Sequence, residues 1–236
     1  MKRRPSRPLL PLFLLTACTD PGSGEVEVRA WGEAFIEEGI PAEQTDDGWA
    51  ISFDRYEVTL RDVSIAGASL DDPDPIDLTR PSMGAGQLVG SAMVTAGDYD
   101  DARFTVAAVL VEGQAERDGV SKRFSWSFDQ PVAYRDCETT TSVPADGLGT
   151  LQITIHADHL FYDSLVSEEP LLGFDAIAAA DLDDDGEITA EELSMVDIGA
   201  FDPGNLPIDD MWSFVSALAA TMGHVDGEGH CASSSS

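Results

Sequence analysis

The apolar run FTVAAVLV at residues 104–111 decides the fold class of this chain. A nearly continuous apolar run of this length is typical of a β-strand that is buried on both faces or lies at the centre of a sheet. The sequence RDG at residues 117–119 follows, and its Asp-Gly step is typical of a tight hairpin turn. Beyond the turn, Phe124, Trp126 and Phe128 lie at alternate positions, so they share one face of a second strand. The sequence thus predicts a β-hairpin whose first strand lies at the centre of a sheet.

Alternating apolar residues indicate further strands on both sides of this hairpin. They lie at residues 26–30, 151–155 and 49–60, and in the last segment the alternation changes phase between Phe53 and Tyr56. A phase change of one residue inside a strand is what a β-bulge produces. Short strands separated by Gly, Pro and Asp favour an antiparallel β-sandwich. The predicted fold is mainly β with an α appendage. An antiparallel β-sandwich, immunoglobulin-like or prealbumin-like, spans 26–157, and a helical EF-hand region follows it.

The apolar period changes in the C-terminal part of the chain, at residues 158–231. Apolar residues recur every three or four positions between residues 208 and 222, which is the stripe of an amphipathic helix. Pro207 is typical of a helix start and Gly223 of a helix end. We expect this helix to pack against the sheet and residues 232–236 to form a disordered tail.

The N-terminal residues carry the pattern of an export signal. Basic residues at positions 2–7 precede an apolar run that is too short for a helix that crosses a membrane. The run ends in Leu15-Thr16-Ala17-Cys18, which resembles the lipobox of bacterial lipoproteins. The resemblance implies a signal peptide over residues 1–17, lipidation of Cys18 and a flexible tether over 18–25. The alternative is an ordinary signal peptide with an incidental cysteine.

A lipid anchor of this kind would place the protein in the cell envelope. Thr19, next to Cys18, stands where an aspartate would resemble an inner-membrane retention signal, so the outer membrane is favoured. The chain carries 44 acidic and 13 basic residues and a formal net charge of −31. Such a surface repels nucleic acid and attracts cations. We therefore expect the membrane as a partner through the lipid, together with a protein or glycan whose identity is open, and no nucleic acid.

The chain has three cysteines. Lipidation of Cys18 leaves Cys137 and Cys231, which we expect to form a disulfide in an oxidising compartment. Such a bridge would close a long loop and stabilise the fold by roughly 4 to 5 kcal/mol in the chain-entropy model. Two free thiols are the alternative.

Several stretches resemble known bacterial proteins. PIDL at residues 75–78, AGDY at 96–99 and the following Arg103-Phe104 are similar to a pattern in secreted bacterial β-sandwich domains. DGWAISFD at residues 47–54, continuing to Val63, resembles a group of lipoproteins from deltaproteobacteria. The resemblance implies a secreted β-sandwich architecture for most of the mature chain and no particular activity.

The sequence DLDDDGEITAEE at residues 181–192 matches the EF-hand calcium loop, including the glycine at the sharp turn. Calcium takes about six to eight oxygen ligands, and the loop supplies them from fixed positions. Those positions hold Asp181, Asp183, Asp185, Glu187, Thr189 and Glu192. The flanking residues suit an entering and an exiting helix. With no second loop in the sequence, we expect weak, constitutive calcium binding that orders the helical region. The alternatives are an acidic surface turn and a calcium loop of the dockerin type.

The four histidines fall into two groups, His156 with His159 and His224 with His230. We expect His156 to lie on the polar face of the last strand, close to His159 and Asp158. Imidazole ligands suit zinc and copper, and three histidines with an open position would resemble a catalytic zinc site. The alternative is that all four are ordinary polar residues at the ends of structural elements, since the spacing His-x-x-His is common.

The sequence contains no nucleophile elbow, no phosphate-binding loop and no His-Glu-x-x-His motif, so an enzyme is not the expected function. The predicted function is that of a calcium-binding, lipid-anchored cell-envelope protein that acts as a structural or binding module. The alternative is a zinc- or copper-binding periplasmic protein, either a metal carrier or a hydrolase. The two differ in whether the histidine groups meet in space around an open cavity. A glycan- or protein-binding sandwich would show exposed aromatic side chains on one sheet face.

Overall fold

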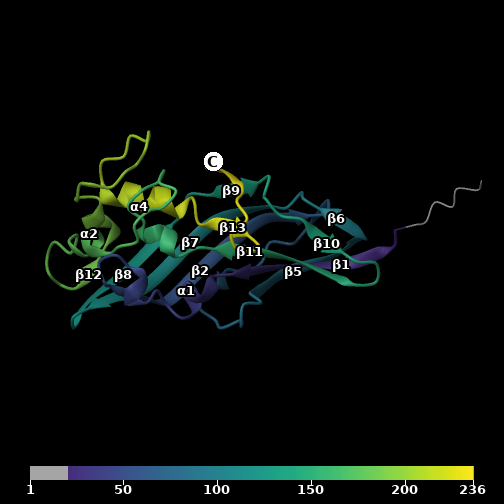
Figure 1. The fold of residues 1–236 in the computed structure, drawn as a ribbon, viewed down its shortest axis with the longest axis horizontal. Helices are drawn as coiled ribbons and strands as arrows, with labels where there is room; N and C mark the ends of the chain where they lie inside the picture. The colour runs from purple at the N-terminus through teal and green to yellow at the C-terminus, as the bar shows by residue number, and fades with distance from the viewer. Residues whose placement is uncertain (1–20, 236) are drawn as a thin grey trace, which may run out of the picture.

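Long strands run along an elongated molecule, and its short helices gather towards one end (Figure 1). The structure is a computed structural model that describes residues 21–235. The larger of its sheets has eight strands, with the order β12-β8-β7-β2-β3 and three further strands paired alongside. These strands are β2 (Ala50–Ile65), β3 (Ala68–Ser69), β4 (Ile76–Asp77), β7 (Arg103–Arg117), β8 (Val120–Phe128), β9 (Val132–Arg135), β12 (Glu187–Ile188) and β14 (Ala232–Ser235).

A second sheet of four strands has the order β13-β11-β1-β5, and two further strands pair separately as β10-β6. The four strands are β1 (Ser23–Trp31), β5 (Gln87–Thr95), β11 (Leu148–Ile155) and β13 (Gly223–Val225), and the separate pair is β6 (Gly97–Tyr99) and β10 (Thr141–Val143). The helices are α1 (Glu33–Glu37), α2 (Asp175–Ala178), α3 (Ala190–Leu193), α4 (Met211–Ala219) and the 3-10 turns η1 (Ala42–Gln44) and η2 (Asp158–Phe161).

The central strand, the hairpin and the bulge follow the sequence predictions. β7 lies between β2 and β8. Asp118 and Gly119 connect β7 to β8 with φ of 52° and 82°, as the favoured two-residue hairpin turn requires. The register of β2 against β7 shifts between Phe53 and Arg55, so Asp54 is the extra residue of a β-bulge.

Strands of both large sheets contribute to one hydrophobic core. Val26 and Val28 of β1 are fully buried, as are Tyr56 and Val58 of β2, and all four belong to the same cluster of buried side chains. The buried face of α4 joins this cluster through residues that include Phe214. The core therefore contains side chains from both large sheets and from α4.

The prediction of a purely antiparallel arrangement is wrong, because both large sheets are mixed. β1 pairs with β11 in parallel, and β12 pairs with β8 in parallel. A parallel pair needs a long connection between its strands. Between β1 and β11 the chain supplies one, since it passes through most of the larger sheet before it returns.

The region 158–231 is less helical than predicted. α2 and α3 have four residues each, and α4 has nine. α4 begins at Met211, after Asp210, whose Oδ1 accepts a hydrogen bond from the backbone N–H of Ser213 at 2.9 Å. The apolar stripe therefore starts before the helix itself, and Gly223 lies in β13 instead of ending the helix. This region also contributes β12 to the eight-stranded sheet and β13 to the four-stranded sheet.

The two ends of the described chain also differ from the prediction. The tail is ordered to residue 235, because β14 pairs with β9 directly after the disulfide that joins Cys231 to Cys137, 94 residues apart in sequence. The predicted disulfide is thus present. β1 begins at Ser23, inside the predicted tether 18–25. The signal peptide 1–17 and the lipidated Cys18 lie outside the described residues.

Among residues 21–235, no helix has the length and apolar character needed to span a membrane.

Candidate metal centre

Strand pairing brings the two groups of histidines together. His156 directly follows β11, and His224 lies in β13 opposite Thr154 of β11. His159 lies in η2, three residues after His156. The ring centroids are 4.4 Å apart for His156 and His224, 5.2 Å for His156 and His159, and 5.3 Å for His159 and His224. The three imidazoles therefore form one cluster.

His156 is the central ring of this cluster and is only 4% exposed. Its Nδ1 lies 3.4 Å from Oε2 of Glu33 and 3.9 Å from Oδ1 of Asp158. Its Nε2 lies 3.3 Å from the carbonyl oxygen of Gly227. His156 has polar partners, as expected for the polar face of the strand, but it is buried, because Glu33 at the start of α1 and Gly227 in the turn after β13 lie against its ring.

His159 and Asp158 are held by neighbouring hydroxyl groups. Nδ1 of His159 lies 2.8 Å from Oγ1 of Thr221, and the Tyr162 hydroxyl donates a hydrogen bond to Oδ2 of Asp158 at 2.5 Å. Burial lowers the pKa of His159 to about 4, although the Asp158 carboxylate opposes this shift. Oδ1 of Asp158 is buried and has no hydrogen-bond partner within residues 21–235. The site therefore combines a neutral imidazole at pH 7 with a carboxylate oxygen that is free to contact a cation.

His224 is buried in the same way, and His230 lies beside it. Burial lowers the pKa of His224 to about 4, and the rings of His156 and His230 lower it further. Nδ1 of His224 is buried without a hydrogen-bond partner in the described part of the chain. His230 is more exposed, with its ring centroid 5.0 Å from that of His224, and it directly precedes the disulfide-bonded Cys231. His224 thus has a nitrogen available for a ligand bond, while His230 lies at the edge of the cluster.

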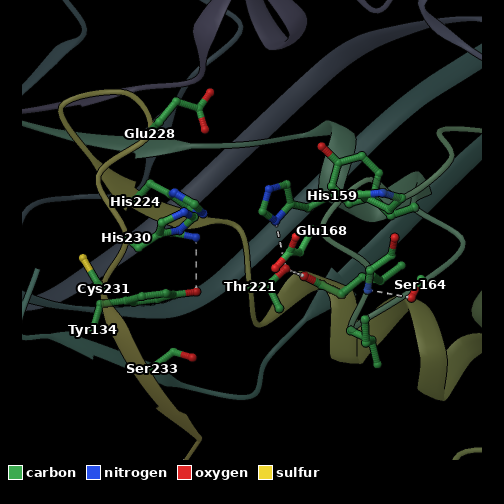
Figure 2. Close-up of a pocket in the computed structure, with 16 residues that line it drawn as sticks. Tyr134, His159, Ser164, Glu168, Thr221, His224, Glu228, His230, Cys231 and Ser233 are labelled. Atoms are coloured by element: carbon green, nitrogen blue, oxygen red, sulfur yellow. Dashed lines mark hydrogen bonds between the residues drawn. The ribbon is translucent and has the colours of Figure 1, made fainter. Parts of the chain in front are cut away.

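The cluster faces a pocket with a volume of about 540 Å³. His159, His224 and His230 line it together with Tyr134 and Glu228, and Figure 2 shows the ring of His159 directed at Thr221 and those of His224 and His230 beside Tyr134. A ligand in this pocket could reach the histidines from solvent. The histidine groups therefore meet beside an open cavity.

Two overlapping sets of side chains have the geometry of a metal site. We name them after their elements: the η2 triad is His156, Asp158 and His159, and the β13 triad is His156, His224 and Glu228. Within each triad, one ligand atom of every residue lies within 4.8 Å of the others. Two imidazoles and a carboxylate form a ligand set that suits zinc, copper or iron. His156 belongs to both triads.

Sequence reasoning missed two carboxylates of this centre. Glu33 comes from the far N-terminal side of the fold, and no motif connects it to the histidines. Its φ of 57° is unusual for a residue with a side chain, and such strain is often found at functional sites. Glu228 lies two residues before His230, so its position beside that histidine was the one available signal. The predicted members His156, Asp158, His159 and His224 are together in the structure, and His230 is adjacent.

The predicted calcium loop keeps three of its ligands together. One carboxylate oxygen each from Asp181, Asp183 and Glu192 lie within 4.8 Å of one another. The side chain of Asp181 is fully buried, and its Oδ1 has no hydrogen-bond partner among the residues described. Gly186 has a φ of 83° and donates its backbone N–H to Oδ2 of Asp181 at 3.0 Å. The loop thus has the turn that the motif requires and a buried oxygen suited to a cation.

The other predicted ligands contact protein groups. Oδ1 of Asp185 accepts the backbone N–H of Glu187 at 2.7 Å, and the Glu187 carboxylate pairs with Arg123 at 2.7 Å. Thr189 and Glu192 form a capping box at the start of α3, in which Oγ1 of Thr189 donates to Oε2 of Glu192 at 2.8 Å. Protein groups inside and outside the loop therefore already contact the carboxylates of Asp185, Glu187 and Glu192.

The surroundings of the loop differ from those of the predicted helical EF-hand. α2 and α3 are single turns, so β12 holds the loop by pairing with β8, and Trp126 Nε1 donates to the carbonyl oxygen of Ile188 at 3.0 Å. The Lys122 ammonium of β8 pairs with Oδ2 of Asp181, and this contact lowers the pKa of Asp181. The sheet, and not a pair of long helices, positions the acidic residues.

Comparison of the chain with protein-family models, with curated proteins and with solved structures found no match.

Proposed function

We propose that this protein binds zinc or copper through His156, His159 and His224, with Asp158 and Glu228 as the nearby carboxylates. The observation that carries the proposal is the meeting of two histidine groups that are distant in sequence. Each group also brings a buried atom without a partner within residues 21–235, Oδ1 of Asp158 and Nδ1 of His224. Buried polar atoms are normally hydrogen-bonded, so unpartnered buried atoms in a histidine cluster suggest a ligand.

The electrostatics of the centre favour a cation. The lowered pKa values of His159 and His224 keep both rings neutral at pH 7, and metal binding requires neutral imidazole. Three carboxylates, from Glu33, Asp158 and Glu228, surround these rings, and the chain as a whole has a formal net charge of −31. The pocket beside the cluster gives a metal a route to solvent, which suits a carrier that exchanges its ion. Hydrolysis of a small substrate in the same pocket is a secondary possibility that activity assays of the zinc-loaded protein can address.

Elemental analysis of the purified protein tests the proposal. The protein is saturated with calcium, dialysed against buffered zinc or copper, and analysed for bound metal. We expect bound transition metal in the unchanged protein and its loss in the double variant His156→Ala/His224→Ala. A Glu168→Gln variant, altered at an exposed residue of the same pocket, should retain the metal. If the double variant binds as much metal as the unchanged protein, the proposed site is wrong.

We also propose that residues 181–192 bind calcium, with Asp181, Asp183, Asp185 and Glu192 as carboxylate ligands and Glu187 and Thr189 as the remaining positions. The support is the fully buried Asp181, whose Oδ1 has no partner within residues 21–235 and lies near oxygens of Asp183 and Glu192. Because β12 in this loop pairs with β8, calcium would stabilise the junction between the loop and the sheet.

The melting temperature with calcium and with chelator tests the second site. Calcium should raise the melting temperature of the unchanged protein, and Glu192→Gln should abolish the increase. Glu191→Gln changes the adjacent exposed carboxylate, which is outside the predicted ligand positions, and should keep it. An increase of the same size in Glu192→Gln would contradict the assignment.

For the whole chain we propose an exported cell-envelope protein, anchored by lipid at Cys18, with the outer membrane favoured over the inner. We interpret its two large sheets, which share one core, as the layers of a β-sandwich. None of the large hydrophobic side chains exposed on residues 21–235 is aromatic. Mass spectrometry of the membrane-associated protein should find acyl chains on Cys18, and Cys18→Ala should move the protein to the soluble fraction.

A further inference from the structure

The shared position of His156 raises the question of how many ions the centre holds. Its two ring nitrogens face different groups: Nδ1 lies near Glu33 and Asp158, and Nε2 lies 3.3 Å from the carbonyl oxygen of Gly227, the residue before Glu228. An imidazole carries its two nitrogens on different edges of the ring, and the neutral ring has one N–H and one free lone pair. The ring can therefore bind two metal ions once the second ion displaces the remaining proton to solvent and the ring becomes an imidazolate.

The side of Nδ1 has the groups that a first ion needs. Oδ1 of Asp158 lies 3.9 Å from Nδ1 of His156, and His159 completes the η2 triad. The Oε2 atom of Glu33, 3.4 Å from the same nitrogen, could serve as a further ligand. Oδ1 of Asp158 is the buried orphan of this side.

The side of Nε2 has an equivalent set. His224 and Glu228 complete the β13 triad with His156. The assignment of this triad to Nε2 rests on Gly227, whose carbonyl oxygen lies 3.3 Å from Nε2 and which directly precedes Glu228. Nδ1 of His224 is buried and has no hydrogen-bond partner in the described part of the chain. Figure 2 shows His224 and Glu228 on one side of the pocket and His159 on the other. Each triad thus has its own partners and its own unsatisfied atom.

The charges around the cluster also exceed what one ion balances. Glu33 and Asp158 lie beside Nδ1 of His156, and Glu228 belongs to the β13 triad, so three carboxylates surround the histidines. Three carboxylates within one cluster repel one another when no cation separates them. With His156 as an imidazolate the centre carries four negative charges, so one divalent ion would leave an excess of negative charge, while two divalent ions would balance it.

From this geometry we propose that the centre holds two divalent transition-metal ions, one in each triad, with the His156 ring between them. The inference rests on the proposed function and extends it by a second metal position. It assigns Asp158 and His159 to one ion, His224 and Glu228 to the other, and His156 to both.

Native mass spectrometry and elemental analysis of the zinc-loaded, calcium-saturated protein count the ions. We expect two zinc ions per chain, one in Asp158→Asn and one in Glu228→Gln, since each variant disables one triad. Glu168→Gln, in the same pocket but in neither triad, should keep two. The melting temperature of each metal-free variant shows that it is folded.

The outcomes separate the two proposals. No zinc in the folded, unchanged protein would remove the proposed function itself. One zinc would leave that function standing and overturn the second position. Two zinc ions that persist in both single variants would overturn the assignment to the triads.

Electron paramagnetic resonance of the copper-loaded protein tests whether the His156 ring lies between the two ions. With two Cu(II) ions bound, the His156 ring should couple their unpaired electrons, so the electron paramagnetic resonance signal should fall below that expected from the copper content. In Asp158→Asn, which should hold one ion, the signal should account for all of the copper. A full, uncoupled signal from the unchanged protein with two copper ions would overturn the bridging position of His156.

Discussion

Lys122 contacts the predicted calcium loop directly. Its side chain is 18% exposed, and its ammonium pairs with Asp181, whose side chain is fully buried. A lysine in this position supplies positive charge where the loop would place calcium. We therefore expect the ammonium to compete with calcium for the same carboxylate.

Replacement of Lys122 should strengthen calcium binding. In Lys122→Met we expect affinity to rise by about tenfold, because removing a close like charge from a partly buried site is worth on the order of 1 to 2 kcal/mol. Without calcium the variant should melt at a lower temperature, since Asp181 would be buried without its ion pair. Calorimetric titration measures the affinity. Arg123→Met, which removes the exposed partner of Glu187, is the control and should leave the affinity unchanged. If Lys122→Met bound calcium with the affinity of the unchanged protein, the competition would be contradicted.

At the level of strands, the β-bulge at Asp54 fixes which side chains face the core. Trp49 and Ile51 before the bulge and Tyr56 and Val58 after it are all buried, although their sequence phases differ. Side chains alternate between the two faces of a strand, so one extra residue is required to keep both sets inside.

Deletion of Asp54 should prevent stable folding, because one of the two sets of apolar residues would move to solvent. Asp54→Ala keeps the residue count and should change the free energy of unfolding by only about 0.5 kcal/mol. Circular dichroism during urea denaturation compares the two variants. A deletion variant with an unfolding transition close to that of Asp54→Ala would show that the bulge does not set the register.

The disulfide joins the segments after β9 and before β14, and its Cys231 lines the pocket of the candidate metal centre. Replacing Cys137 and Cys231 with serine should lower the free energy of unfolding by about 4 kcal/mol, given the long loop that the bond closes. The effect should also reach β14, whose pairing with β9 begins at the residue after Cys231. Hydrogen exchange of residues 232–235 measures the local effect and urea denaturation the global one. Unchanged exchange in the double variant would mean that strand pairing alone holds the tail.

On the scale of the whole molecule, burial of neutral histidines makes stability depend on pH. The pKa values of His159 and His224 are about 4 in the folded protein, against 6.5 for a free imidazole. The unfolded chain therefore binds more protons between these values, and stability falls as pH decreases from 6.5 towards 4. Above pH 6.5 the contribution of the two histidines is fully present.

The melting temperature of the metal-free protein between pH 7 and pH 4 checks this dependence. We expect a decrease that corresponds to a few kcal/mol, with most of it above pH 4. A His159→Gln/His224→Gln variant should show a flatter profile over the same range. Identical profiles for the two proteins would place the pH dependence in other groups, such as Asp175, Asp181 and Glu192, whose lowered pKa values act at lower pH.

Local patterns predict much of this structure, and long-range pairing accounts for the rest. The phase change at Asp54, the turn at Asp118-Gly119 and the bond between Cys137 and Cys231 each depend on a short pattern or on elimination, and all three are present. The parallel pairing of β1 with β11 has no such local pattern, because it depends on where the chain returns. For the same reason Glu33, which approaches His156 through that sheet, could not be found from the sequence.

The order in which the chain emerges has a consequence for the metal centre. His156 and Gly227 are separated by 71 positions, so at about 5–20 residues per second the second half of the centre follows the first by roughly 4 to 14 s. During this interval a nascent chain exposes the η2 side alone, and β13 has yet to arrive. If the chain crosses a membrane unfolded, the two sides of the candidate centre would meet only after translocation, and the metal would have to come from the compartment where the chain finishes folding.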